Sequence, residues 1–158
     1  LARYYCSNCG TIHYQNPNMV VGAIALWEGK ILLARRDIEP RKGFWNLPCG
    51  FLELNETVEE GAKREVLEET GALINLGPLQ SVYNLPKAQQ VYLIFTAQML
   101  NSSFTTTAES AEVKLFSIDK IPWGEIAFSS NTFALETFIA DLKSGQSNVH
   151  FGTYKHNI

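Results

Sequence analysis

The apolar positions of the middle of the chain fall into short runs rich in Val, Ile and Leu, a pattern typical of strands in a buried sheet. Two of these runs are separated only by Glu28-Gly29-Lys30, which predicts a β-hairpin. The polar stretch 101–107 is expected to be another hairpin loop. The sequence therefore predicts strands over residues 19–27, 31–34, 73–83, 91–100 and 113–117.

Two segments instead repeat their apolar residues at helical spacing. Thr57 followed by Glu60 forms a capping box, in which a hydroxyl and a carboxylate satisfy each other's backbone amides, and Gly71 suits the C-terminal end. A second helix is expected over 132–142. Strands before and after a central helix predict one α/β domain with a mixed sheet and helices on both faces.

The first helix carries its acidic residues in an unusual place. Its apolar stripe is Val58, Ala62 and Val66, and on the same side or at its margin lie Glu65, Glu68 and Glu69. Like charges three and four residues apart repel, and the C-terminal half of a helix disfavours anions. A divalent cation such as Mg²⁺ or Mn²⁺ would remove both penalties, since these ions prefer oxygen ligands and share their remaining positions with phosphates.

An alternative explains the same helix without a metal. Glu60 and Arg64 are spaced to form an ion pair four residues apart, and the other glutamates would simply be solvated. The helix pattern alone leaves both interpretations open.

The longer segment from Gly50 to Ala72 favours the first interpretation. It reads G-x5-E-x7-R-E-V-x-E-E-x-G-A, and it resembles a Nudix box in which every position is filled. A 23-residue pattern with this many fixed polar positions is far more specific than a single glycine motif. The resemblance implies a hydrolase of nucleoside diphosphates linked to another moiety, folded as an α/β/α sandwich.

The resemblance also implies roles for individual residues. Glu65, Glu68 and Glu69 would bind Mg²⁺ or Mn²⁺, and backbone carbonyls at Cys49 or Gly50 would contribute to the same metal site. Arg64 would hold a glutamate in place by a salt bridge, and Glu56 would brace the loop against the helix.

A diphosphate bond is shielded by negative oxygens, so its hydrolysis needs charge neutralisation, an aligned water and a proton acceptor. Glu68 is the acceptor favoured within the box. Glu112 resembles a glutamate downstream of the box that supplies a further metal ligand or base in some members of the family. The alternative interpretation is that Glu112 is a solvated loop residue.

The three cysteines are not expected to form a disulfide framework, because their number is odd and the sequence shows no secretory signal. Cys6-x-x-Cys9 has the spacing of a zinc knuckle, which supplies two of the four ligands of a structural Zn²⁺. A second knuckle would have to precede Leu1. We therefore expect residues 1–17 to be part of a zinc-ribbon-like segment and residues 18–158 to be the Nudix domain.

Other segments narrow the resemblance to one branch, the FAD or ADP-ribose pyrophosphatases of bacteria and plant plastids. They are Tyr14-Gln15-Asn16-Pro17, Asn46-Leu47-Pro48, Ala127-Phe128-Ser129-Ser130 and Phe151-Gly152-Thr153. Pro86 lies roughly where ADP-ribose hydrolases of the family carry a proline. The stretch typical of NADH pyrophosphatases is replaced by Ser81-Val82-Tyr83-Asn84-Leu85-Pro86, so hydrolysis of NADH or of NAD-capped RNA is the less favoured alternative.

Several residues are candidates for binding the rest of the substrate. Arg35, Arg36 and Arg41 have the charge to pair with phosphate oxygens. Phe44, Trp45 and Tyr83 have rings that can stack on adenine or flavin, although core positions are the preferred interpretation for all but Tyr83. Phe128 is also expected in the core.

Composition limits the other classes of function. With 46% hydrophobic and 18% charged residues, the 158-residue chain is expected to be a soluble intracellular domain, in the cytoplasm or an organelle stroma, with no membrane span. Its formal charge of −3 argues against a nucleic-acid partner. A homodimer is possible because relatives form them. An alternative to an enzyme is a nucleotide sensor that binds its ligand without hydrolysing it. Such a sensor would not need three metal-binding carboxylates.

Overall fold

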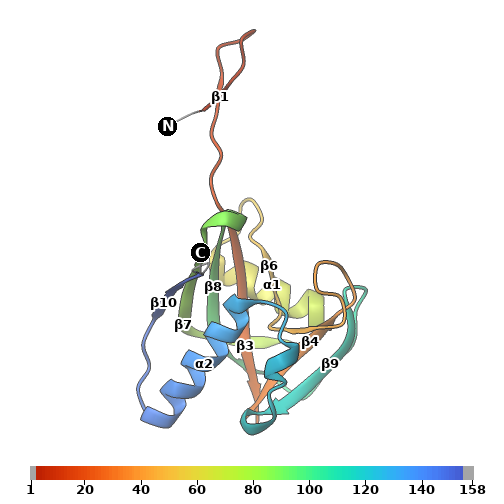
Figure 1. The fold of residues 1–158 in the computed structure, drawn as a ribbon. Helices are drawn as coiled ribbons and strands as arrows, with labels where there is room; N and C mark the ends of the chain where they lie inside the picture. Colours follow the sequence, from red (N-terminus) through yellow and green to blue (C-terminus); the bar gives the residue numbers. More distant parts are fainter. Residues whose placement is uncertain (1–2, 155–158) are drawn as a thin grey trace.

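A computed structural model describes residues 3–154, and its central element is one eight-stranded mixed sheet (Figure 1). The strand order is β10-β7-β8-β3-β4-β5, with β6 pairing β3 and β9 pairing β4. Only the β10–β7 and β3–β8 pairs are parallel. The strands are β3 (Asn18–Trp27), β4 (Lys30–Arg36), β5 (Trp45–Asn46), β6 (Cys49–Phe51), β7 (Ile74–Leu85), β8 (Gln90–Met99), β9 (Ser110–Ser117) and β10 (His150–Thr153).

The predicted hairpin is confirmed. Strands β3 and β4 are antiparallel, with Trp27 opposite Lys30. Glu28 and Gly29 between them have φ values of 47° and 74°. Positive φ at both central residues is the turn geometry that matches the twist of a two-residue hairpin, and glycine at the second position lowers its cost.

Helix α1 (Val58–Thr70) begins and ends as the sequence predicts. The Thr57 side chain accepts a hydrogen bond from the Glu60 amide, and the Glu60 carboxylate accepts one from the Thr57 amide at 2.8 Å. Gly71 closes the helix in the left-handed conformation, with φ of 68°. Because Glu60 is engaged in capping, it does not form the ion pair with Arg64 that the alternative interpretation requires.

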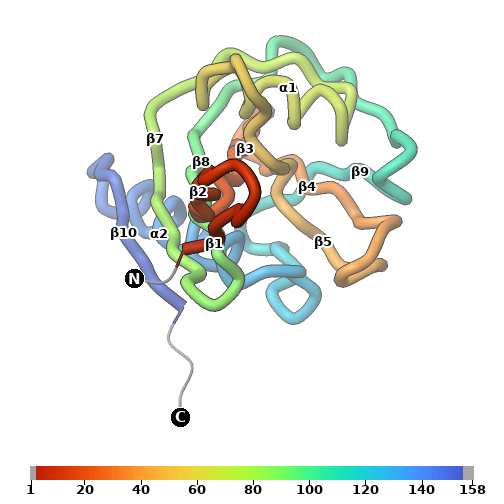
Figure 2. Tube along the Cα trace, turned by 90° about the horizontal axis from the view of Figure 1, so that it is seen from above, coloured from red at the N-terminus to blue at the C-terminus, as the bar shows by residue number. Residues whose placement is uncertain are grey.

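The two faces of the sheet carry separate hydrophobic clusters. Alternate residues of β3 point to opposite faces, so Val21 and Ala23 pack with Ala62 and Val66 of α1, whereas Ile24 packs beneath the other helix. That helix is α2 (Ser129–Ser144), three residues longer at its start than predicted. Figure 2 shows α1 and α2 on either side of β3 and β8. The predicted α/β sandwich is therefore confirmed.

The prediction of a hairpin loop at 101–107 is wrong. Strands β8 and β9 do not pair with each other, because β9 pairs with β4. The connection instead packs on the C-terminal end of α1, where the Thr105 amide donates to the Thr70 carbonyl at 2.8 Å and the Ser110 hydroxyl to the Glu69 carbonyl at 2.8 Å. Turn-forming composition predicts a loop but not which strands it connects, and here it anchors the end of the acidic helix.

Residues 3–17 project from the domain as a separate small hairpin (Figures 1 and 2). Its strands are β1 (Tyr4–Tyr5) and β2 (Ile12–His13), which pair with each other alone. Cys6 and Cys9 lie in its turn as free thiols, and the Cys9 thiol donates to Thr11 at 3.1 Å. Hydrogen bonding of the Thr11 side chain and backbone to the thiolate form lowers the pKa of Cys9. Within residues 3–154, no third metal-binding side chain joins the two cysteines.

Neither helix of the part of the chain that the structure describes has the length and apolar character needed to cross a bilayer.

Candidate active site

Two of the three predicted metal carboxylates are buried where α1 faces the sheet. Glu65 and Glu69 are 8% and 7% exposed, because they share a side of the helix with Val66, which packs into the core. Glu68 is turned outward, with 57% of its side chain exposed. The helix therefore carries two carboxylates inward and one at the rim.

Arg64 links these carboxylates to the loop before the helix. Its Nη1 donates to Glu65 at 2.6 Å and to Glu68 at 3.0 Å, while Nε and Nη2 donate to the two oxygens of Glu56 at 3.0 and 2.6 Å. The Phe51 carbonyl accepts a further bond from Nη2 at 3.0 Å. Hydrogen bonds from Arg64 lower the pKa of Glu56 to about 2, so Glu56 is a fixed anion that holds the guanidinium.

Gly50 in β6 leaves the space that Glu65 occupies. A Cβ atom at this position would collide with the Glu65 carboxylate, so any other residue would displace that side chain. The glycine of the box is thus required by a close approach of side chain to backbone. It brings the Gly50 peptide next to the carboxylates.

Burial and mutual repulsion make these two glutamates unfavourable as anions. Burial is the main reason that the pKa of Glu69 rises to about 8, and the neighbouring charge of Glu65 adds to it. Burial also raises the pKa of Glu65. The only hydrogen bond to the Glu69 carboxylate within residues 3–154 is a long one of 3.4 Å from Asn46. A positive charge placed among these oxygens would favour the ionised forms.

The carboxylates line a cavity of about 440 Å³ on the surface of the domain. Its other walls come from β3, from the β4–β5 loop, from β8 and from the start of α2. Besides Glu65, Glu68 and Glu69, the residues that matter here are Arg36, Cys49, Gly50, Tyr92, Glu109 and Phe128. The cavity therefore combines acidic, basic and aromatic groups.

The donor set fits Mg²⁺ or Mn²⁺, although the side chains are not gathered as a cage. Among residues 3–154, no three His, Cys, Asp or Glu side chains converge on one point. Arg64 explains this, because its Nη1 holds Glu65 and Glu68 while Glu69 contacts Asn46. The available donors are carboxylate oxygens, the ligands that hard divalent cations prefer. Glu65, Glu68, Glu69 and the peptide at Gly50 are the groups that would hold such an ion.

Glu109, rather than Glu112, is the downstream acid that reaches this cavity. Glu112 is paired with Arg35 at 3.6 Å, and neither residue lines the cavity. The negative charge of Glu109 contributes to the raised pKa of both Glu65 and Glu69. The sequence analysis proposed Glu112 and not Glu109. In the structure Glu112 lies opposite Arg35 in the β4–β9 pair, whereas Glu109, just before β9, lines the cavity.

Of the remaining residues discussed in the sequence analysis, some line the cavity and others lie elsewhere in the domain. Arg36 lines the cavity, and so does Cys49, whose thiol pKa is raised by burial and by the charge of Glu69. Tyr83 is buried against Phe133, with ring centroids 5.0 Å apart, and does not reach the cavity. Phe128, expected in the core, is only half-buried and lines the cavity instead.

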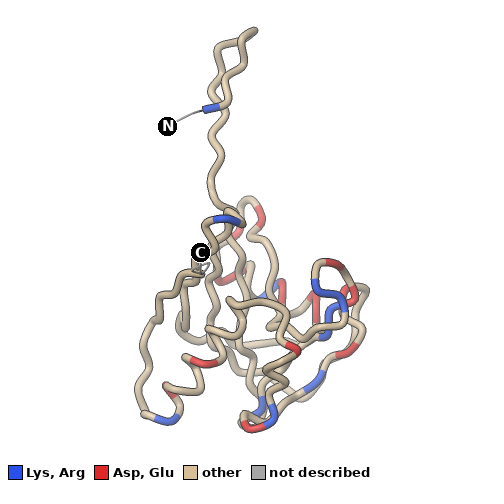
Figure 3. The backbone as a smooth tube through the Cα atoms, in the orientation of Figure 1, with Lys and Arg blue, Asp and Glu red and all other residues tan. Residues whose placement is uncertain are grey.

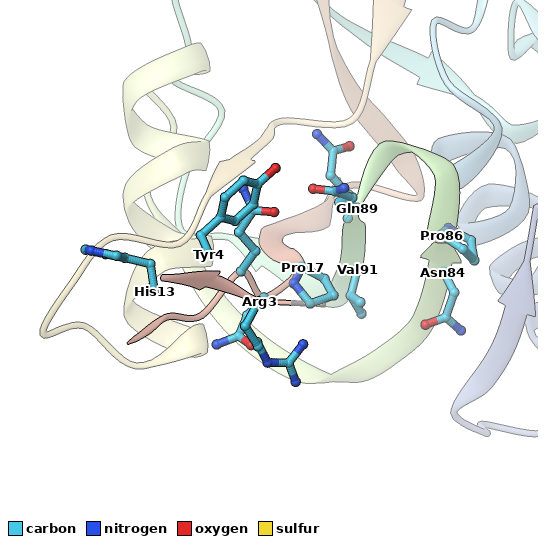
Figure 4. A pocket seen from close by; sticks show the side chains of 11 residues that line it. Arg3, Tyr4, His13, Pro17, Asn84, Pro86, Gln89 and Val91 are labelled. Atoms are coloured by element: carbon cyan, nitrogen blue, oxygen red, sulfur yellow. The ribbon is translucent and has the colours of Figure 1, made fainter. Parts of the chain in front are cut away.

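Pro86 lies in a second cavity, of about 410 Å³, between the N-terminal hairpin and the turn after β7 (Figure 4). This turn includes the short 3-10 helix Pro86–Ala88. The lining has no acidic residue, and it includes Tyr4, His13 and Pro17 from the N-terminal segment. Gln90 lines both cavities, so the second cavity adjoins the acidic one.

Comparisons with known proteins identify the class that this fold and site define. The family model described as the NUDIX domain matches residues 16–135, so the chain belongs to the Nudix family and is a Nudix hydrolase. Members of this family generally use Mg²⁺ or Mn²⁺.

Individual relatives place the chain within the family. It is 45% identical to a NUDIX hydrolase of Nitrosomonas europaea, with a TM-score of 0.94 over 98% of this chain and 88% of that one. It is 32% identical to a protein of Methanocaldococcus jannaschii named ADP-ribose pyrophosphatase, over 69% of this chain and 67% of that protein. It is 28% identical to the NAD-capped RNA hydrolase NudC of Stutzerimonas stutzeri, over 86% of this chain but only 49% of that protein.

Proposed function

We propose that the protein hydrolyses the diphosphate bond of a nucleoside diphosphate linked to another moiety, with ADP-ribose or FAD as substrate and AMP as a product. The observation that carries this proposal is the pair of buried glutamates, Glu65 and Glu69, in an open cavity. Glu65 shares Arg64 with two other glutamates, and no lysine or arginine of residues 3–154 forms an ion pair with Glu69. The name of the Methanocaldococcus relative supports ADP-ribose, and the resemblance of the chain to FAD and ADP-ribose pyrophosphatases supports both substrates.

The proposed division of roles follows from the positions of the side chains. Glu65, Glu68 and Glu69 hold Mg²⁺ or Mn²⁺, with the backbone at Cys49 and Gly50 beside them. When bound, the cation supplies positive charge to the diphosphate and activates water. Glu68 is the proposed proton acceptor because it is exposed at the rim, within the same cavity.

Two further residues support this set. Arg64 is a positioning residue, since its guanidinium is fully engaged with Glu56, Glu65 and Glu68. Glu109 takes the role that the sequence suggested for Glu112, because it lines the cavity and Glu112 does not. Glu109 is then an additional metal ligand or base.

The proposed substrate is a small molecule rather than a nucleic acid or a membrane. Figure 3 shows Lys and Arg interspersed with Asp and Glu along the loops instead of gathered in one basic stripe. Phosphate-backbone binding depends on such a stripe. The likeness to NudC supports NADH as an alternative substrate, whereas the charge distribution makes NAD-capped RNA the less favoured one.

An assay of AMP release tests the proposal. The protein is incubated with Mg²⁺ and, separately, with ADP-ribose, FAD, NADH and diadenosine polyphosphates. We expect AMP release from ADP-ribose or FAD at the highest kcat/KM, and its loss on chelation of the metal. Binding of these compounds without any hydrolysis would contradict the proposal and favour a nucleotide sensor.

We also propose that Cys6 and Cys9 are two ligands of a structural Zn²⁺. Both thiols lie in one tight turn, and the lowered pKa of Cys9 favours the thiolate that binds zinc. The other ligands would come from outside residues 3–154. Mass spectrometric metal analysis should find zinc in the protein and lose it in Cys6→Ser, with Mg²⁺-dependent activity retained.

A further inference from the structure

One aromatic ring and one arginine in the acidic cavity are not explained by metal binding. The Arg36 guanidinium lies over the Phe128 ring, with its carbon 5.0 Å from the ring centroid, and both residues line the cavity. Phe128 is the residue just before α2, where no side chain caps the helix. Phe128 is only half-buried and belongs to none of the hydrophobic clusters of the core, so its presence beside the acidic residues calls for another reason.

Arg36 is held in place but keeps hydrogen-bonding capacity. Its Nε donates to the Pro40 carbonyl at 2.8 Å, which fixes the guanidinium plane, and no acidic side chain within residues 3–154 pairs with it. Arg64, the other arginine that lines the cavity, already binds three glutamates, and Arg35, which pairs with Glu112, does not line it. Arg36 is therefore the cation of this cavity that is available to a ligand.

The walls around this pair are suited to a flat ring with a polar edge. Ile38 and Pro40 supply apolar surface. Tyr92 lines the same cavity, and its hydroxyl donates to the Gln90 amide oxygen at 3.2 Å. Burial raises the pKa of Tyr92 to about 12, so it remains a neutral hydroxyl at physiological pH. Apolar faces with hydrogen-bonding groups at the boundary match the two surfaces of a heterocyclic base.

We propose that the Arg36–Phe128 pair is the subsite that binds the planar heterocycle of the substrate. A guanidinium is planar and stacks on aromatic rings, so an arginine that already covers a phenyl ring presents a stacking surface to a base. Arg36 and Phe128 line the same cavity as Glu65 and Glu69, so this surface lies beside the proposed metal site. This inference rests on the proposed function and adds to it that recognition requires a base, not only a diphosphate.

The test compares a substrate with its base-free counterpart. ADP-ribose carries one adenine, whereas bis(ribosyl) diphosphate keeps the reacting bond and both sugars and lacks the base. In Phe128→Ala we expect kcat/KM for ADP-ribose to fall about tenfold to a hundredfold, since the ring that supports the stacking surface of Arg36 is lost and a stacked base contributes about that much. The value for bis(ribosyl) diphosphate should change by no more than about twofold, and Phe128→Tyr should retain the activity on ADP-ribose.

Two further variants distinguish the loss of stacking from the loss of charge and from a nonspecific effect of removing a phenyl ring. Arg36→Lys keeps the positive charge but loses the planar group. Its kcat/KM should therefore fall for ADP-ribose but not for bis(ribosyl) diphosphate. Phe151→Ala removes a phenyl ring that is 74% exposed on β10 and outside the cavity, and it should behave as the wild type on both substrates. Equal losses on both substrates in Phe128→Ala, or no loss on either, would overturn the inference.

Failure of the proposed function gives a different result. If the wild type cleaves neither substrate, the hydrolase proposal fails, and calorimetric binding of AMP and ribose 5-phosphate tests the subsite by itself. Weaker binding of AMP, but not of ribose 5-phosphate, in Phe128→Ala would support the heterocycle subsite. Equal binding of AMP by both proteins would overturn it.

Discussion

Two buried carboxylates of this protein, Glu69 and Asp141, have almost the same exposure, 7% and 8%, and opposite surroundings. Asp141 in α2 lies 2.9 Å from His150 Nε2 and accepts a hydrogen bond from Gln80 at 3.1 Å. Burial alone would raise its pKa, yet the hydrogen bonds from His150 and Gln80 hold it below the usual value. The protein itself satisfies this carboxylate.

Glu69 is not satisfied in this way. Its neighbours are other carboxylates, one amide at 3.4 Å and a cavity, and its pKa rises to about 8. The difference shows that burial of a carboxylate does not by itself indicate function. What distinguishes the acidic cavity is that the described residues leave its negative charge uncompensated, which a bound divalent cation would correct.

The largest expected effect is on turnover. Glu68→Gln and Glu69→Gln should each lower kcat by about 10²- to 10³-fold, because each removes a charge that stabilises the metal and the transition state. Circular dichroism and urea unfolding should show a folded protein in both cases. Glu59→Gln on the exposed face of the same helix is the matched control and should retain full activity. Unfolding of the Glu69→Gln protein would instead indicate a structural role.

Arg64→Lys should have the next largest effect, a fall in kcat of roughly tenfold to a hundredfold. A lysine cannot reproduce the paired bonds to Glu56 together with those to Glu65 and Glu68. Steady-state kinetics at saturating Mg²⁺ measures the change. Wild-type kcat in this variant would show that charge alone positions the glutamates.

Asp141→Ala should affect stability and not chemistry. It leaves the buried Gln80 amide without its acceptor, which costs about 1–3 kcal/mol in the free energy of unfolding. Urea denaturation measures this cost, and kcat per folded molecule should stay at the wild-type value. A selective loss of kcat with unchanged stability would remove the distinction between the two carboxylates.

The remaining prediction concerns the dependence of stability on pH. The folded pKa of Glu69 is raised from 4.5 to about 8, so the folded state binds more protons than the unfolded state between these values. Stability of the metal-free protein should therefore fall as pH rises from about 4.5 to 8. Thermal unfolding with and without Mg²⁺ tests this, since the stabilisation by Mg²⁺ should grow over the same range. Glu69→Gln should flatten both trends.

The elements of the fold could be predicted from local signals. The capping box at Thr57, the glycine at position 71 and the turn at Glu28-Gly29 each fix a boundary through the nearest few residues, and all three are confirmed. Strand β10 was missed because four residues with no clear alternation carry no such signal. The connection at 101–107 was misassigned because the partner of β9 is decided by the whole sheet.

The residues of the site likewise fall into a group that local spacing predicts and a group that depends on long-range packing. The spacing on α1 is enough to predict that Glu65 and Glu69 share the inward side of the helix, because both belong to one regular element. The choice of Glu109 over Glu112, and of Phe128 over Tyr83, depends on which strands meet and how α2 docks on the sheet. Such long-range packing is not encoded in the local pattern.

The most direct test of the central claim is diffraction from crystals soaked in Mn²⁺, recorded at a wavelength where manganese scatters anomalously. The account predicts an anomalous peak among the carboxylates of Glu65, Glu68 and Glu69, absent in Glu69→Gln. Crystals that show no peak at these side chains, while Mn²⁺ in the same solution still supports hydrolysis, would contradict it.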